Sequence, residues 1–209
     1  MAAVKPSISE NLSYAWEALK ENIWVLLGLF VGYIILVYAL VFIGAAIDNI
    51  VITGTFQLAM WIIALFFSLG FIRCCLNAVD KKEVSFAAFK NLGGCILSYI
   101  IASILYGLVI VVGLIFLILP GLWLYTRLQF YPYFIVEEKE GPFGALQKSW
   151  NLTKGEDSYV IVLVLAWIGI TLLGFICLFV GMFVAILVMY LSQAYAYRTL
   201  CEKFVIEEE

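Results

Sequence analysis

Long apolar runs dominate this chain and limit what it can fold into. Each run is about 20 residues long, and a helix of that length crosses the roughly 30 Å hydrocarbon core of a bilayer. Of the 209 residues, 65% are hydrophobic and only 13% are charged, which is about half the charge of a typical water-soluble domain. The sequence therefore predicts an all-α integral membrane protein, with residues 1–209 forming a single polytopic domain.

The apolar runs indicate six transmembrane helices. They are Ile23–Ala46, Val51–Ile72, Cys95–Leu119, Leu122–Val136, Tyr159–Leu178 and Gly181–Phe204. The fourth is short and alternates polar with apolar residues, as a strand does. A lone strand in lipid leaves its backbone groups unsatisfied, so a helix is expected here too. The last two runs form one continuous apolar block, in which Gly174 and Gly181 are the candidates for a turn.

The positions of lysine and arginine predict how the helices are oriented. Basic residues occur before the first span, in the long loops around 73–90 and 139–154, and at the end of the sixth span, whereas the other three connections hold none. Because basic loops stay on the cytoplasmic side, we expect a multi-pass protein of the cytoplasmic (inner) membrane with both termini in the cytoplasm. The first 22 residues lack a signal peptide's apolar core, so the first span is expected to be an uncleaved anchor.

Each cytoplasmic segment contains a short amphipathic stretch ahead of two spans. This pattern predicts three similar units over residues 1–80, 81–140 and 141–209, each a cytoplasmic amphipathic helix followed by a hairpin of two transmembrane helices. The likeness between the units lies in their pattern of apolar and polar residues more than in residue identity. The chain is therefore expected to consist of three hairpins.

The first two amphipathic stretches carry recognisable start signals. The first begins at Ser7, with Glu10 at the spacing of a capping box. The second is the segment SFAAFKNL, with Ser85 as its N-cap and with Phe86 and Phe89 on one side. The expected apolar face of the first stretch consists of Ile8, Leu12, Trp16, Leu19 and Ile23.

The third amphipathic stretch is GPFGALQKSWNLTKG. Pro142 suits a first helical turn, and Gly155 suits the end of a helix. The residues expected at the membrane interface are Phe143, Leu146 and Trp150 on the apolar side, with Lys148 toward water. Two interpretations remain open for all three stretches. They cover the inner ends of the bundle as elbows, or they form a surface that senses lipid or docks a partner.

Arg127 is the one basic residue that the expected topology does not place in a cytoplasmic segment or at the cytoplasmic end of a span. On a continuous helix, Trp123 lies one turn before it and Tyr131 one turn after it, on the same face. Pro132 frees the carbonyl of Leu128 and favours a kink. No carboxylate is expected near the centre of the membrane to pair with the arginine. The guanidinium is therefore expected to face the protein interior or a polar cavity near Tyr131.

Two roles are open for this arginine. In the structural one, the guanidinium stacks on aromatic rings, bonds to helix-end carbonyls or extends toward water. In the functional one, it binds a phosphate or carboxylate in a water-filled or lipid-headgroup cavity. The candidate anion or lipid site then consists of Arg127, Tyr131, Trp123, Gln57 and Gln193.

The residue content excludes several kinds of chemistry. The chain has no histidine, which removes Ser–His and Cys–His nucleophile pairs and histidine metal sites. Its five cysteines include no CxxC pair and are expected to be small apolar packing residues. A net charge of −3 without a basic stripe gives no reason to expect nucleic acid as a partner. We therefore expect no enzymatic activity, no cofactor and no metal.

A motif runs from the fourth span into the third amphipathic stretch. It comprises Pro120-Gly121, Tyr131-Pro132, Glu137-Glu138, Ala145-Leu146, Ser149-Trp150, Leu152-Thr153 and Gly155. This pattern resembles a group of prokaryotic six-helix membrane families of largely unknown function, which includes the membrane domain attached to some glycerophosphodiester phosphodiesterases. The resemblance implies a fold and a membrane location. Because the chain contains no hydrolase domain, phosphodiesterase activity does not carry over.

These observations predict a non-enzymatic multi-pass membrane protein. It handles lipid or an amphiphilic anion, or it is a structural subunit of a membrane complex. The alternative is a small-solute transporter or channel with a polar interior near Arg127. Membrane lipids are the expected partners, and a homo-oligomer or a larger membrane complex is also open. Gly28 and Gly32 have the GxxxG spacing that suits close helix packing, either within the chain or between copies.

Overall fold

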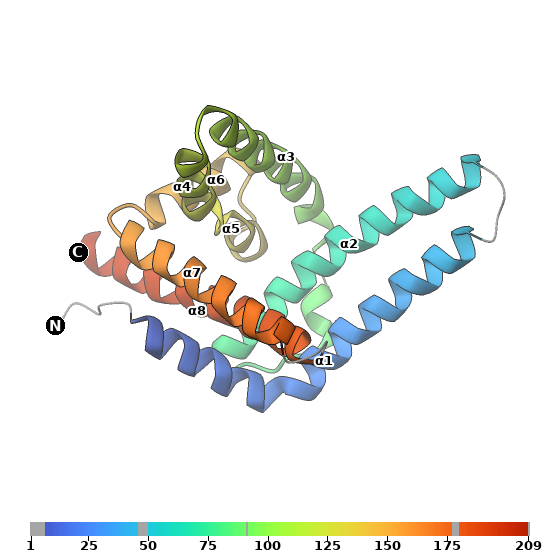
Figure 1. Ribbon diagram of the computed structural model, residues 1–209, viewed down its shortest axis with the longest axis horizontal. Helices are drawn as coiled ribbons and strands as arrows, with labels where there is room; N and C mark the ends of the chain where they lie inside the picture. The colour runs from blue at the N-terminus through green and yellow to red at the C-terminus, as the bar shows by residue number, and fades with distance from the viewer. Residues whose placement is uncertain (1–6, 46–49, 91, 177–179, 209) are drawn as a thin grey trace.

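All regular structure in the described part of the chain is helical, which confirms the all-α prediction. The computed structural model describes residues 7–45, 50–90, 92–176 and 180–208, and Figure 1 shows the arrangement of its helices. They are α1 (Ile8–Ala45), α2 (Ile50–Val79), the 3₁₀ helix η1 (Phe86–Phe89), α3 (Gly93–Phe116), α4 (Ile118–Leu128), α5 (Tyr131–Glu138), α6 (Pro142–Leu152), α7 (Asp157–Ile176) and α8 (Val180–Glu208).

Four stretches of the described chain are long and apolar enough to cross a bilayer. They are Ile8–Gly44, Thr53–Val79, Gly93–Phe116 and Asp157–Ile176. These stretches coincide with the first, second, third and fifth expected spans and indicate a membrane protein. The expected sixth span falls on α8, whose second half carries Gln193, Arg198, Glu202 and Lys203. This helix is not among the four stretches found in the described residues.

The expected fourth span, Leu122–Val136, is not one continuous helix. Instead, α4 ends at Leu128 and α5 begins at Tyr131. Pro132 causes the break, because it has no N–H to donate to the carbonyl of Leu128 and its ring crowds the preceding turn. With its 11 residues, α4 is about 16 Å long, roughly half the thickness of the hydrocarbon core. The prediction of a single helix over this stretch was therefore wrong.

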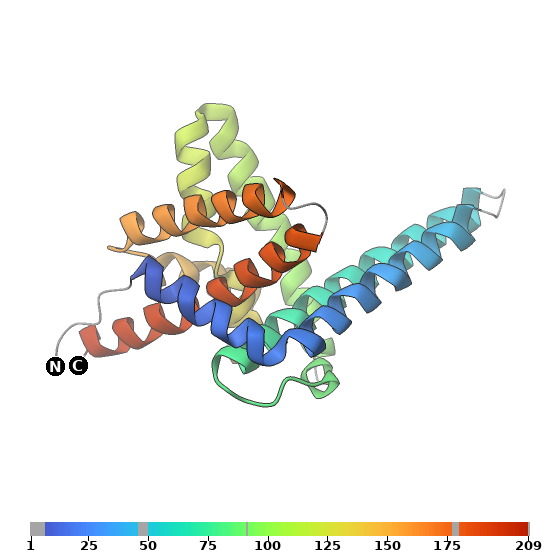
Figure 2. The same cartoon turned by 60° about the horizontal axis from the view of Figure 1, so that its bottom comes forward.

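Helices that follow each other in the chain pack side by side: α1 with α2, α3 with α4, and α7 with α8. The outer parts of the first two pairs project from the body in different directions (Figures 1 and 2). We call these outer parts the arms; the first arm is residues 31–44 with 53–65, and the second is residues 104–122. The remaining ends meet in the base, which we define as α5, α6, residues 69–80 at the end of α2, residues 123–128 of α4, residues 157–164 of α7 and residues 187–200 of α8.

The base contains a large part of the hydrophobic core, which continues into α1 and α7. Residues 133–136 of α5 are buried, together with Cys74 and Cys75 of α2. Tyr133 stacks on Tyr197 of α8 with ring centroids 5.0 Å apart, and Phe134 meets the same Tyr197 ring edge-on at 5.2 Å. The short helix after the break is therefore the centre of the fold rather than part of a lipid-facing span.

Ion pairs connect the segments that were expected in the cytoplasm. Arg198 near the end of α8 binds Asp80, which follows α2, with 2.8 Å between Nη2 and Oδ2. The same guanidinium binds Glu137 at the end of α5 at 2.6 Å. Lys203 binds Glu156 in the loop between α6 and α7. The segments after α2, α5 and α6 thus lie at one end of the molecule, together with the last turns of α8.

The first amphipathic stretch is continuous with the first expected span, since α1 is a single helix of 38 residues that bends where it leaves the body (Figure 2). It buries a different face from the one predicted. Leu19 is buried as expected, but Trp16 is 48% exposed, whereas Asn11, Ala15 and Ala18 are buried. These small side chains let α1 pack closely along α8, and this close packing determines which face turns inward.

The second amphipathic stretch is shorter than predicted. It forms only the four-residue 3₁₀ helix η1, and Ser85 is at its N-cap without a side-chain capping bond. Asn91, the next-to-last residue of this stretch, lies outside the described residues. The third stretch forms α6 from Pro142 to Leu152 as predicted, and Gly155 follows it with a φ of +89°.

Four glycines and one cysteine were also singled out in the sequence. Gly174 lies inside α7 rather than in a turn, and a Cβ on it would be 2.7 Å from the carbonyl oxygen of Gly181. This glycine therefore permits close packing of α7 on α8, while the turn itself and Cys177 lie outside the described residues. A Cβ on Gly28 or Gly32 would meet nothing within 4 Å. The GxxxG pair thus makes no close packing contact with the rest of the described chain.

Candidate functional site

Two hydroxyl groups from α6 hold the break between α4 and α5. The Ser149 hydroxyl donates to the backbone oxygen of Arg127 at 2.9 Å and accepts from the N–H of Phe130 at 3.1 Å. The Thr153 hydroxyl lies 3.2 Å from the same Arg127 oxygen. Because a broken helix leaves backbone groups without their usual partners, these contacts replace the missing ones. They give the serine and threonine of the Ser-Trp-x-Leu-Thr motif a structural role.

The side chain of Arg127 is enclosed by two tryptophans and an aspartate. Its Cζ lies 4.9 Å from the ring centroid of Trp123 and 5.0 Å from that of Trp150, which is cation–π distance. Its Nη2 donates to Asp157 Oδ2 at 2.7 Å. Trp123 Nε1 donates to the other carboxylate oxygen, Oδ1, at 3.0 Å. Asp157 is the first residue of α7, where the helix dipole also favours a negative charge.

The expectation that no carboxylate would be available to Arg127 was wrong. Asp157 reaches it because the end of α4 packs against the start of α7. The Arg127 side chain is 8% exposed and that of Asp157 is 37% exposed, so the pair lies at the edge of the protein interior. Arg127 Nε is buried without a hydrogen-bond partner among the described residues. The guanidinium faces inward, but a resident carboxylate already neutralises its charge.

Tyr131 does not join this arrangement. Its hydroxyl is 2.9 Å from the hydroxyl of Ser103, and its ring packs against Tyr106 with centroids 5.1 Å apart. Both partners belong to α3. The helix break turns Tyr131 away from Arg127, so reasoning from a continuous helix failed for the residue after the break. It succeeded for Trp123, which precedes the break.

The two predicted glutamines are also separate from the Arg127 side chain. Gln57 is exposed on the first arm. Gln193 Nε2 of α8 lies 3.4 Å from the backbone oxygen of Gln129, so this glutamine contacts the break rather than the guanidinium. The five residues of the predicted anion site therefore do not converge on one cavity.

The predicted interfacial face of α6 divides into two parts. Phe143 is 71% exposed and Leu146 is half-buried, so this end of the helix is free to meet a membrane surface. Trp150 packs edge-on against Trp123 with ring centroids 5.1 Å apart and also stacks on Arg127. The face that α6 turns to the protein consists of Ala145, Ser149 and Leu152.

Lys148 of α6 is a local electrostatic anchor. It forms ion pairs with Glu138 and Glu140 at the end of α5. Hydrogen bonds with Glu138 and then Glu140 raise the pKa of Lys148, and the hydrogen bond from Lys148 lowers the pKa of Glu140. These pairs fix α6 against α5, with the lysine on the polar side of α6 as predicted from the sequence.

A buried polar network that was not predicted from the sequence lies between α1, α7 and α8. Asn11 Nδ2 donates to the hydroxyl of Tyr159 at 3.1 Å and to the backbone oxygen of Ser192 at 3.1 Å. The Ser192 hydroxyl donates to Asn11 Oδ1, and Trp167 Nε1 donates to that hydroxyl oxygen at 2.7 Å. One sequence signal pointed to this network, because Asn11 shares a helical face with the small residue Ala15.

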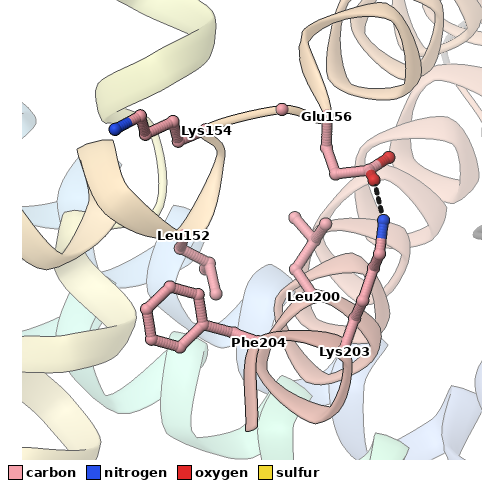
Figure 3. A pocket seen from close by; sticks show the side chains of 7 residues that line it. Leu152, Lys154, Glu156, Leu200, Lys203 and Phe204 are labelled. Atoms are coloured by element: carbon pink, nitrogen blue, oxygen red, sulfur yellow. Dashed lines mark hydrogen bonds and ion pairs between the residues drawn. The ribbon is translucent and has the colours of Figure 1, made fainter. Parts of the chain in front are cut away.

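A small cavity of about 120 Å³ lies between the α6–α7 loop and the end of α8. Leu152, Leu200 and Phe204 form its apolar wall, while Glu156 and Lys203 face each other as an ion pair (Figure 3). Lys154 also lines the cavity, so its lining carries one positive charge beyond this ion pair. Among the described residues, no group of three His, Cys, Asp or Glu side chains lies close enough to hold a metal ion.

Comparison with known proteins identifies the family. Residues 56–199 match a family described as a domain of unknown function, DUF7847. The chain belongs to this family. The matched region starts within α2 and includes Trp123, Arg127, Trp150 and Asp157. The whole enclosure of Arg127 is thus part of the family domain, whereas α1 lies before it.

Curated relatives come from mycobacteria. The chain is 28% identical over 153 residues to the uncharacterised protein Rv2560 of Mycobacterium tuberculosis (strain ATCC 25618 / H37Rv). It is also 28% identical over 153 residues to the uncharacterised protein Mb2590 of Mycobacterium bovis (strain ATCC BAA-935 / AF2122/97). Each match covers 72% of this chain and 46% of the relative, so the chain spans about half the length of these relatives. No solved structure matches it significantly.

The family match agrees with the expectation of a family without a known function. It provides no link to the membrane domain attached to glycerophosphodiester phosphodiesterases. That likeness, which depends on the motif from Pro120 to Gly155, remains a prediction.

Proposed function

We propose that this chain is a non-enzymatic multi-pass protein of the cytoplasmic membrane that holds or moves lipid, or another amphiphilic anion, between its helix pairs. The observation that carries the proposal is the open apolar surface of the arms. Large exposed side chains on the first arm include Ile35, Tyr38, Phe42, Leu58 and Trp61, and those on the second include Leu108, Val111, Ile115, Phe116 and Leu119. Apolar surface of this extent calls for lipid or a partner.

An apolar groove supports the lipid reading. It has a volume of about 460 Å³ and lies between α1, α7 and α8. Leu12 and Trp16 of α1 form one wall, and Leu173 of α7 with Val184 and Val188 of α8 form the other. A groove with such a lining suits a hydrocarbon chain far better than a polar solute. Its natural occupant in a bilayer is the acyl chain of a phospholipid.

The proposed topology keeps three hairpins and both termini in the cytoplasm. The second hairpin is modified, because α3 returns through the short α4 rather than through a full-length span. The ion pairs from Arg198 to Asp80 and Glu137 support this orientation, since they join segments that the positive-inside rule places on the same side. The resemblance to prokaryotic six-helix membrane families supports it as well.

A structural subunit of a membrane complex is the second candidate. The observation that favours it is the pair Gly28 and Gly32, which is exposed on α1 and would admit a close helix from another copy or partner. The transporter or channel remains the alternative. The polar interior proposed for it near Arg127 is not open, because Arg127 is paired with Asp157 and covered by Trp123 and Trp150.

Native mass spectrometry of the protein in mild detergent tests the proposal, because it reports bound lipid and subunit number together. We expect a monomer or small oligomer that retains phospholipid. A lipid-free protein in a fixed oligomer would favour the structural subunit and contradict lipid handling. Flux of small solutes through liposomes containing the protein would instead favour the transporter.

A further inference from the structure

A polar pocket of about 530 Å³ lies where the end of α2, η1, the start of α3 and the end of α5 meet. Three of its lining side chains are cationic, namely Arg73, Lys90 and Lys139, and Glu83 is the one carboxylate in the lining. A volume of this size suits a molecule such as a lipid headgroup rather than a single small ion. The pocket therefore offers a net positive charge to a ligand of that size.

The three cations of the pocket form no ion pair with any carboxylate in the described part of the chain. Among the described residues, no carboxylate lies within 4.0 Å of Arg73, Lys90 or Lys139, whereas Arg127, Lys148, Arg198 and Lys203 each form an ion pair. Arg73 is half-buried. Its Nη1 donates to the backbone oxygen of Val136 at 3.0 Å, which holds the guanidinium in place and leaves most of its five N–H donors for another acceptor.

Neutral donors complete the lining. The Ser85 hydroxyl makes no capping bond to η1. Leu92 and Cys95, at the start of α3, line the pocket, and α3 has no side-chain cap. The first N–H groups of a helix lack intrahelical partners, and the positive end of its dipole attracts anions. A Cβ on Gly93 or Gly94 would meet nothing within 4 Å, so an anion has room to approach the backbone here.

We propose that this pocket binds the phosphate of an anionic phospholipid headgroup. Arg73, Lys90 and Lys139 neutralise the phosphate, the Ser85 hydroxyl donates a hydrogen bond to it, and the positive end of the α3 dipole favours its charge. The position of the pocket favours lipid over free phosphate, because it lies at the adjacent ends of two stretches able to cross a bilayer, Thr53–Val79 and Gly93–Phe116. The headgroup layer begins at such ends. This inference rests on the proposed function and names the anion handled.

A matched pair of double variants tests the site. Lys90→Gln with Lys139→Gln removes two cations from the pocket, and both side chains are exposed, so the fold should survive. Lys20→Gln with Lys154→Gln is the control, because these lysines are also exposed, lie outside the pocket and change the net charge equally. Delipidated protein in mild detergent is titrated with dioleoylphosphatidylglycerol and followed by native mass spectrometry. Dioleoylphosphatidylcholine serves as the zwitterionic comparison.

We expect the pocket variant to bind phosphatidylglycerol about tenfold more weakly than the wild type and the control variant. Phosphatidylcholine should bind all three proteins alike. If both variants bind phosphatidylglycerol equally weakly, the loss comes from general surface charge, and the proposed site is wrong. Displacement of phosphatidylglycerol by equimolar inorganic phosphate would overturn the lipid as its ligand.

The two proposals fail in different ways. If the wild type binds neither phospholipid, lipid handling itself is wrong, and the headgroup site falls with it. If the wild type binds phosphatidylglycerol and the pocket variant binds it equally well, only the headgroup site is wrong.

Discussion

The base and the arms differ in whether their charged and aromatic side chains find partners within the protein. In the base, charged and aromatic side chains find partners within the protein, as Arg127 does with Asp157 and Tyr133 with Tyr197. In the arms, aromatic side chains such as Trp61 lie largely exposed. Within the second arm, the close contact between α3 and α4 depends on Gly113 and Gly121 instead. Specific polar and aromatic contacts therefore determine the fold at the base. The exposed apolar side chains of the arms are instead suited to contact with lipid hydrocarbon. Substitutions in the two regions should therefore have unequal effects.

The largest effect is expected at the pair in the base. Replacing Asp157 with Asn leaves the mostly buried Arg127 guanidinium without a counter-ion. We expect this change to lower the free energy of unfolding by about 3 kcal/mol, the low end for breaking a buried pair, because Asp157 is 37% exposed. Reversible unfolding of the detergent-solubilised protein by SDS measures the loss.

Arg127 provides the control for this comparison. The double variant Arg127→Gln with Asp157→Asn should lose clearly less than the sum of the two single variants, because each single change already breaks the pair. A protein stabilised by Arg127→Leu would instead show that the side chain faces lipid, and the contrast between base and arms would fail at this position.

A smaller effect is expected inside the second arm. A Cβ on Gly113 would lie 2.9 Å from the Cα of Gly121, so Gly113→Val must push α3 and α4 apart. We expect a loss of about 1–3 kcal/mol in unfolding free energy. Gly28→Val is the matched control on α1, where a Cβ meets nothing within 4 Å, and it should change stability by less than about 0.5 kcal/mol. Equal losses for both variants would show that Gly28 also has a packing partner, and native mass spectrometry would then reveal a change in subunit number.

The smallest effect concerns pH and the ion pairs of the base. Partial burial raises the pKa of Asp80, but hydrogen bonds from Lys82 and Arg198 outweigh this, so its pKa lies below the ordinary value. The stabilisation is therefore fully present above the unfolded pKa of about 4 and is lost as the pH falls through the folded pKa. Asp80→Asn should cost under about 1 kcal/mol at pH 7 and should flatten the acid side of the stability profile. Profiles of equal slope below pH 4 would contradict the role of this pair.

Patterns within one segment of sequence predicted the fold well, and contacts between distant segments limited the prediction. Apolar runs located the four stretches of the described chain that are able to cross a bilayer. The break before Tyr131 was harder to foresee, because Pro132 is compatible with a mere kink when another segment supplies hydrogen bonds. That support comes from Ser149, 19 residues beyond Phe130. No local pattern shows that the two segments meet.

Prediction of the candidate site was also limited by contacts between distant segments. Helical spacing correctly placed Trp123 beside Arg127, since both precede the break. It could not identify Asp157, which lies 30 residues further along the chain. The cations of the proposed headgroup pocket were visible in the sequence, but only as signs of a cytoplasmic loop. Their convergence depends on how α2, α3 and α5 pack, and spacing along the chain does not contain that information.

The network around Asn11 has a consequence for how the protein is assembled. Asn11 and its partner Ser192 are 181 positions apart, so the ribosome makes Ser192 long after Asn11. A buried amide without a hydrogen-bond partner costs roughly 1–3 kcal/mol in proteins. The N-terminal part of α1 therefore gains its final place only after α8 has been made. Until then its polar group needs water or an insertion factor as a temporary partner, and a chain that stops before α8 keeps that need permanently.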